Sequence, residues 1–171
     1  MALGAQLSHH GRIIVALTLR EMSTRFGREG LGFAWIILEP LAFCVGVLFL
    51  WAMTKPAYEH GVRLAPFVMS GYMCIILMRH QISFSMGAIQ GNVGLLHHRP
   101  VKPVHLLLTR NLLEVGGATA AFVVVYVSLI LMGQASPPYD YLLLYAGWAL
   151  LAWIGMGFAL FLAGLAMRFD V

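Results

Sequence analysis

Residues 19–43 read LREMSTRFGREGLGFAWIILEPLAF and join two kinds of segment. The first part is charged and has helical periodicity, whereas the second is an apolar run that contains Glu39 and Pro40. Glycines at the junction give the chain room to turn between the two parts. The join predicts a helix on the membrane surface, placed against the mouth of a transmembrane bundle.

The composition indicates a membrane protein. Of the 171 residues, 60% are hydrophobic and only 11% are charged, and the mean hydropathy is +0.83. Soluble domains carry about 25% charged residues, so this chain cannot cover itself with polar surface. The formal net charge of +4 does not indicate a nucleic-acid partner, because the basic residues lie beside apolar runs.

Four apolar segments are long enough to cross a bilayer, which takes about 20 helical residues. They are Phe33–Met53, Leu64–Met86, Leu112–Met132 and Leu142–Met167. The sequence therefore predicts an all-α integral membrane fold with an amphipathic helix followed by four transmembrane helices. All Lys and Arg residues except Lys55 and Arg63 fall on one side of these spans, which predicts a cytoplasmic N-terminus.

The amphipathic helix is predicted over residues 12–26. Its apolar stripe would consist of Val15, Leu19, Met22 and Phe26, and its polar face of Arg20, Glu21, Thr24 and Arg25. Such a helix can lie in the headgroup plane with its apolar face down. The alternative is an ordinary basic flank that anchors the first span.

A long polar stretch, residues 87–110, connects the second and third predicted spans. Residues 88–98 are expected to form a short helix, and Pro103 suits the first turn of the following helix because its missing N–H is not needed there. The result would be a hairpin with a basic tip at Arg99 and Lys102. A plain connecting loop is the alternative.

Glu39 and Arg79 are ionisable residues inside predicted spans, where such groups face a bundle interior or a cavity. At about 1.5 Å per residue, each lies roughly 9 Å from the inner edge of the membrane. We hypothesise that they share a polar niche near the inner mouth; separate contacts with the cytoplasmic interface are the alternative. Pro40 predicts that the first span bends or starts afresh.

Small residues predict close helix packing at Gly116 with Ala120, and at Gly155, Gly157 and Gly164. No motif of a nucleotide-binding loop, zinc protease or serine hydrolase is present in the sequence. His97, His98 and His105 lack acidic or Cys ligands at useful spacing. We therefore predict no catalytic residue, no metal site and no cofactor bound by this chain.

Several features follow one another along the chain: a surface helix, a glycine turn, Trp35 and Glu39-Pro40 in the first span, Ser70-Gly71-Tyr72 in the second, and Pro103 ahead of the third. This order resembles the permease subunit of ABC-2 type exporters, specifically the capsular polysaccharide export inner-membrane permease. The most specific part is LREM–TRFGREGLGFAW–LEPL, and the match covers essentially the whole chain.

That family has six spans, whereas this sequence stops at MRFDV, just after the fourth predicted span. The resemblance thus implies a single permease domain over residues 1–171 that is incomplete at its C-terminus, either a truncated gene product or a fragment. We expect it to preserve the fold of the first four spans.

The resemblance also implies roles for particular residues. The interface helix would include Arg20, Glu21 and Arg25. The region that couples to an ATPase would comprise Leu95, Leu96, His97, His98, Arg99 and Lys102. Candidate pore or gate residues are Phe33, Trp35, Glu39, Tyr72 and Arg79.

By this resemblance the chain would be the transmembrane subunit of an exporter in a bacterial inner membrane. Its cargo would be a lipid-linked capsular polysaccharide, or an O-antigen or teichoic-acid-like polymer. Expected partners are a cytosolic ABC ATPase that holds ATP and magnesium, a second permease copy, and periplasmic and outer-membrane export proteins. The alternative is a non-transporting membrane scaffold or an inactive remnant of a split gene.

Overall fold

The computed structural model describes residues 2–26, 32–54, 58–59, 61–92, 94 and 101–169. Within these ranges the helices are α1 (Ala2–Phe26), α2 (Gly32–Thr54), α3 (Leu64–Met86), the 3-10 helix η1 (Gln90–Asn92), α5 (Pro103–Leu131) and α6 (Tyr141–Phe169). Two short strands, β1 (Tyr58–Glu59) and β2 (Val62–Arg63), pair antiparallel between α2 and α3. The fold is therefore all-helical apart from this small hairpin, which the sequence did not predict.

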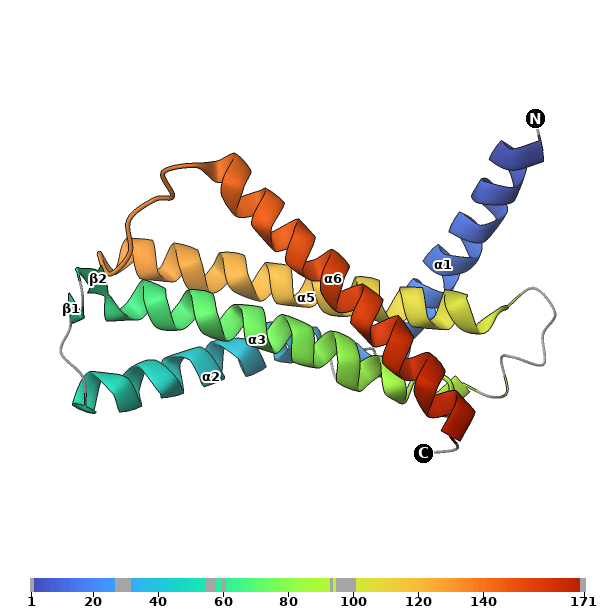
Figure 1. Ribbon diagram of the computed structural model, residues 1–171, viewed down its shortest axis with the longest axis horizontal. Coiled ribbons are helices and arrows are strands. Elements are labelled where there is room, and N and C mark those ends of the chain that lie inside the picture. Colours follow the sequence, from blue (N-terminus) through green and yellow to red (C-terminus); the bar gives the residue numbers. More distant parts are fainter. Residues whose placement is uncertain are drawn as a thin grey trace.

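Helix α3 lies at the centre of the bundle. Helices α2, α3 and α5 run side by side, α6 crosses them obliquely and packs mainly on α3, and α1 leaves one end of the bundle at an angle (Figure 1). Cys44, Met69, Met73, Val125 and Leu129 form an apolar core between α2, α3 and α5. Most of the bundle is thus assembled around one helix.

The two ends of the bundle carry different elements. At one end α1 contacts η1 and the start of α5, and at the other lie the β1–β2 hairpin and the turn after α5 (Figure 1). Gly133, with a φ of +68°, forms that turn, and the N–H of Gln134 donates to the carbonyl of Leu129 (2.9 Å). Helix α1 and the segment before α5 therefore share one end, as their predicted location on one membrane side requires.

The helix boundaries agree with most of the predicted spans. Helix α3 covers the predicted residues 64–86, and α2 and α6 each extend one or two residues beyond the predicted ends. The expectation that the first span starts afresh near Pro40 is wrong, because α2 continues through this residue. Pro40 is instead accommodated inside a helix, at the cost of one backbone hydrogen bond.

One other boundary prediction is wrong. Helix α1 begins at Ala2 rather than at residue 12, since residues 2–7 are mostly Ala, Leu and Gln, which favour helix. Helix α5 begins at Pro103, so the end of the polar stretch, residues 103–110, forms the first turns of the helix that continues into the third predicted span. The placement of Pro103 in the first turn of that helix is confirmed.

The predicted short helix over residues 88–98 differs from what the structure describes there. Residues 87–89 form a turn and η1 follows, while residues 95–100 lie outside the described residues. Three glycines among residues 87–94 disfavour a continuous α-helix in this region.

Gly155 of α6 lies directly against α3. A Cβ atom at this position would lie 2.0 Å from Oε1 of Gln81, a fully buried side chain whose amide N–H donates to the carbonyl of Ala152 (3.0 Å). By contrast, the space around Gly116, Gly157 and Gly164 is open within 4 Å. Of the predicted glycine packing positions, Gly155 is the one that meets another helix closely within the described chain.

Helices α5 and α6 are each long and apolar enough to cross a membrane. Large apolar side chains on α6 face outward, with Leu142 78% and Trp153 72% exposed. The core helix of a soluble protein would bury such side chains, so lipid is the environment that suits this helix. That α2 and α3 also span the membrane stays a prediction.

Candidate functional site: a polar seam between four helices

Five ionisable side chains from four helices form two neighbouring groups near the α1 end of the bundle. We call them the polar seam: Glu21 of α1, Glu39 of α2, His80 of α3, and Arg110 and Glu114 of α5. Charged groups are costly inside a membrane protein unless they pair, so this concentration marks a candidate functional site.

The first group is an ion pair between α1 and α5. Nη2 of Arg110 lies 2.8 Å from Oε1 of Glu21, and the two side chains are only 17% and 12% exposed. This distance is typical of a charge-assisted hydrogen bond. The pair therefore fixes α1 to the bundle at one well-defined point.

The second group places His80 between two carboxylates. Its Nε2 lies 3.7 Å from Glu39 and its Nδ1 lies 3.6 Å from Glu114, and Glu114 is 8% exposed. These separations exceed those of a hydrogen bond, and each contact is an ion pair when the imidazole is protonated. Three helices that are distant in sequence meet at this imidazole.

Helix α5 joins the two groups. Arg110 and Glu114 are four residues apart, which puts them on neighbouring turns of one helix face. The polar seam consequently runs from α1 through α5 and α3 to α2, where it ends beside Pro40. It provides a chain of side-chain contacts from the surface helix to the proline of α2.

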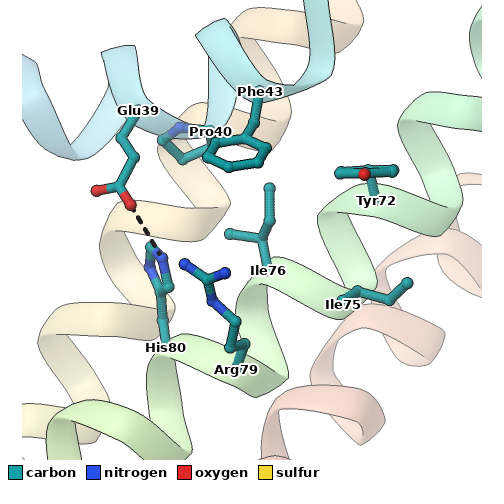
Figure 2. Close-up of a pocket in the computed structure, with 8 residues that line it drawn as sticks. All are labelled: Glu39, Pro40, Phe43, Tyr72, Ile75, Ile76, Arg79 and His80. Carbon is teal, nitrogen blue, oxygen red and sulfur yellow. Dashed lines mark ion pairs between the residues drawn. The ribbon is translucent and has the colours of Figure 1, made fainter. Parts of the chain in front are cut away.

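A cavity of about 200 Å³ opens beside the α2 end of the polar seam. Its lining residues are Glu39, Pro40, Phe43, Tyr72, Ile75, Ile76, Arg79 and His80 (Figure 2). The hypothesis that Glu39 and Arg79 share a niche is met in part, because both line this cavity. The ion pair of Glu39, however, is with His80 rather than with Arg79.

The remaining predicted site residues are dispersed. Tyr72 lines the cavity, whereas Trp35 is 61% exposed and does not line it. Arg20 donates to Oδ1 of Asn92 (3.2 Å), and Lys102 is exposed just before α5. The side chains of Arg25 and Phe33, and the whole of residues 95–99, lie outside the described residues.

Helix α1 turns Leu17 and Glu21 toward the bundle and Val15 and Leu19 of its predicted apolar stripe away from it. Val15 and Leu19 are 59% and 62% exposed, while Glu21 contacts α5. A soluble helix would show the opposite arrangement. The exposed stripe suits a helix that lies on lipid, as the sequence predicted.

A histidine contact also joins α1 to α5. The N–H of Lys102 donates to Nδ1 of His105 (3.1 Å), which leaves the other ring nitrogen of His105 to donate to Nδ1 of His10 at 2.9 Å. His105 is nearly buried, and burial, together with His10 and Lys102, lowers the pKa of this imidazole below its ordinary value of 6.5. His105 lies in the first turn of α5, before the apolar run that begins at Leu112.

Sequence reasoning missed His80, Arg110 and Glu114. Glu114 could have been found, because it is an acidic residue inside a predicted span and such residues mark polar sites. In the sequence, Arg110 is only one of the basic residues that predict the membrane orientation. Nothing local in the sequence indicates that its partner is in α1. Among the described residues, no group of three His, Cys, Asp or Glu side chains comes together as a metal site would require.

Comparison with known proteins identifies relatives of the chain, although no model of a protein family matches it. The chain is 33% identical to the capsule polysaccharide export inner-membrane protein BexB of Haemophilus influenzae over 165 residues, which are 96% of this chain and 62% of the relative. The corresponding protein CtrC of Neisseria meningitidis is 31% identical over 159 residues, which are 93% of this chain and 60% of CtrC.

A further relative is the polysialic acid transport protein KpsM of Escherichia coli. It is 33% identical over 151 residues, which are 86% of this chain and 57% of KpsM. The chain spans about 60% of the length of the curated relatives that it matches. The resemblance seen in the sequence is confirmed: over nearly its whole length the chain is a homologue of the capsule polysaccharide export inner-membrane proteins of the ABC-2 permease family.

Proposed function

We propose that this chain is the transmembrane subunit of an ABC exporter that moves a capsular polysaccharide across the inner membrane, powered by a separate ATPase. Similarity to capsule polysaccharide export inner-membrane proteins along 93–96% of the chain is the observation that carries the proposal. We assign α2, α3, α5 and α6 as membrane spans with a cytoplasmic N-terminus, and α1 as a helix on the cytoplasmic surface.

The proposed partners follow from this assignment. A cytosolic ATPase would hold ATP and magnesium and would bind the segment between α3 and α5, including residues 95–102. A second permease copy would complete a channel for the lipid-linked polymer, and periplasmic and outer-membrane export proteins would continue the path outward. This chain itself would perform no catalytic step.

The polar seam supplies a physical route for coupling. If the ATPase displaces α1, the Glu21–Arg110 pair must either move α5 as well or separate. Removing one partner of a buried ion pair costs about 3–5 kcal/mol, so joint movement is favoured. Glu114 and His80 then extend the same constraint to Glu39 and to the proline of α2.

Deletion of the gene in the bacterium that carries it tests the proposal. We expect the surface polysaccharide to disappear and lipid-linked polymer to accumulate inside the cell, with both effects reversed by the wild-type gene. Export that continues unchanged in the deletion strain would contradict an export function.

Co-purification separates an exporter from a non-transporting scaffold. Replacement of residues 95–102 by a neutral linker should abolish binding of the ATPase. Tyr139→Ala should not, since Tyr139 is fully exposed and belongs to the segment between α5 and α6, which lies at the opposite end of the bundle (Figure 1). A complex that survives the replacement would remove this segment as the ATPase contact.

A further inference from the structure

An exposed stripe on α3 ends at Arg79. Phe67, Gly71, Ile75 and Arg79 follow one another at intervals of four residues and all are exposed, with Phe67 58% and Ile75 64% accessible. Residues at this spacing lie on one helix face. The face is thus apolar over three positions and cationic at the fourth.

Arg79 carries a charge that nothing in the described chain neutralises directly. Its guanidinium group points from α3 toward α2, beside His80, and makes no hydrogen bond or ion pair with another described residue (Figure 2). Glu39, the carboxylate in the same cavity, faces His80 instead. A guanidinium group inside a membrane requires an anion or water close by.

The cavity around Arg79 is otherwise mostly apolar. Pro40 and Phe43 of α2 and Ile76 of α3 form its walls, and Tyr72 contributes a phenol group (Figure 2). A ligand that fits must therefore combine an anionic group with hydrocarbon. Inorganic phosphate would satisfy Arg79 but would leave the apolar walls uncovered.

The stripe is as long as a lipid tail. From Arg79 to Phe67 the rise is about 18 Å at 1.5 Å per residue, which is more than half of a hydrocarbon core of about 30 Å. Gly71 keeps the middle of the stripe open, because no atom lies within 4 Å of a Cβ built there. The stripe therefore leaves room for a hydrocarbon chain at Gly71.

We propose that this cavity and the stripe Phe67–Gly71–Ile75 bind an anionic membrane lipid, with the phosphate of its headgroup on Arg79 and one tail along the stripe. The proposal rests on the proposed function only for the placement of α3 across the membrane. With a cytoplasmic N-terminus, Arg79 lies in the inner half of the membrane, roughly 9 Å from its inner edge, and a tail along the stripe runs from there toward and past the bilayer centre. The lipid would therefore belong to the inner leaflet, with its headgroup drawn inward to Arg79.

Native mass spectrometry of the purified full chain, taken from bilayers of defined composition, tests this. Phosphatidylglycerol should be retained in preference to phosphatidylcholine with the same tails. Arg79→Gln should reduce this retention roughly tenfold, the factor expected for loss of one charge-assisted contact. Arg168→Gln, which removes an exposed charge at the end of α6, is the matched control and should retain the lipid.

A second variant tests the tail without touching the charge. Gly71→Leu fills the open position on the stripe and should reduce retention without lowering the melting temperature, because a Cβ built at this position meets no atom within 4 Å. Glycerol 3-phosphate, the headgroup without a tail, should not displace the lipid. Displacement by it would show a site for soluble anions and would overturn the proposal.

Equal retention of the two lipids, or unchanged retention in Arg79→Gln, would also overturn it. If Arg79→Gln and Gly71→Leu change the oligomeric state and leave lipid retention unchanged, a second copy of the chain covers this face and the lipid proposal fails. The measurement needs neither the ATPase nor a polymer. A negative result therefore leaves the export function standing, and loss of export with intact lipid retention would leave the lipid site standing.

Discussion

Helices α1 and α6 are both attached to the outside of the α2–α3–α5 bundle, but by different kinds of contact. Helix α1 is attached by a few polar pairs, chiefly Glu21 with Arg110 and His10 with His105. Helix α6 packs along α3 with apolar side chains and comes closest where Gly155 faces Gln81. A small displacement of α1 breaks its polar pairs together, whereas the packing of α6 on α3 involves contacts along the helix. Helix α1 is therefore the element suited to move relative to the bundle, and α6 is the one suited to stay in place.

The difference lies in the distance dependence of the two contacts. A buried ion pair adds little net stability when formed, yet an unpaired buried charge costs several kcal/mol. The contact between α1 and α5 is therefore stable in one position of α1 and unfavourable in nearby positions. A helix that switches between two positions requires such a contact. Apolar packing leaves no unpaired charge when it separates, and its contribution depends on the area buried.

The largest expected effect is from Arg110→Met. This variant leaves the carboxylate of Glu21 largely buried without its guanidinium partner and should lower the free energy of unfolding by about 3 kcal/mol. Thermal unfolding in detergent measures it, with Arg168→Met as the control for loss of an exposed charge. The double variant Glu21→Arg with Arg110→Glu should recover part of the loss.

His80→Leu extends the test to the centre of the polar seam. Without the imidazole, the carboxylates of Glu39 and Glu114 lose the polar side chain that lies between them, and we expect a loss of about 2 kcal/mol in the free energy of unfolding. A double-mutant cycle with Glu114→Gln should show coupling of about 1 kcal/mol. Additive effects would mean that His80 and Glu114 do not interact, and the polar seam would end at α5.

Gly155→Ala examines the α6 contact. The new methyl group overlaps Oε1 of Gln81, and relief requires this buried amide to turn away from the carbonyl of Ala152, so we expect a loss of about 1–2 kcal/mol. Gly157→Ala, two residues further on in open space, should instead be neutral or stabilise the helix. Equal effects of the two variants would contradict the close packing at Gly155.

The sequence allowed prediction of the features that depend on neighbours along the chain. Apolar run lengths predicted α3, and the missing N–H of proline predicted the first turn of α5 at Pro103. The ionisable residues of predicted spans led to Glu39 and Arg79, which line one cavity. These signals are local, because hydrophobic run length and capping act within a few residues.

Contacts between distant helices could not be predicted in this way. Periodicity puts Gly155, Gly157 and Gly164 in one helix but does not reveal which of them meets α3. Charge counting includes Arg110 among the basic flanks without showing that Glu21 is its partner. Such pairings depend on how the helices are rotated and crossed, which a single sequence does not contain.

The smallest expected effect is a pH dependence confined to the α1 contact. Burial and the nearby His10, Lys102 and His9 lower the pKa of His105, so the folded state disfavours its protonated ring. The stability that depends on this contact is present above pH 6.5, the ordinary value for histidine, and is lost as the pH falls below it. Protonation at Nδ1 would also remove the acceptor that Lys102 uses.

Hydrogen exchange of α1 amides measures this pH dependence. After correction for the intrinsic rate, protection of α1 should be lower at about pH 5.5 than at about pH 7.5, while protection of α6 should be unchanged. His105→Gln should reduce the difference, because the titrating ring is absent. Parallel loss of protection in both helices at low pH would show general destabilisation and would remove the distinction between the displaceable helix α1 and the fixed helix α6.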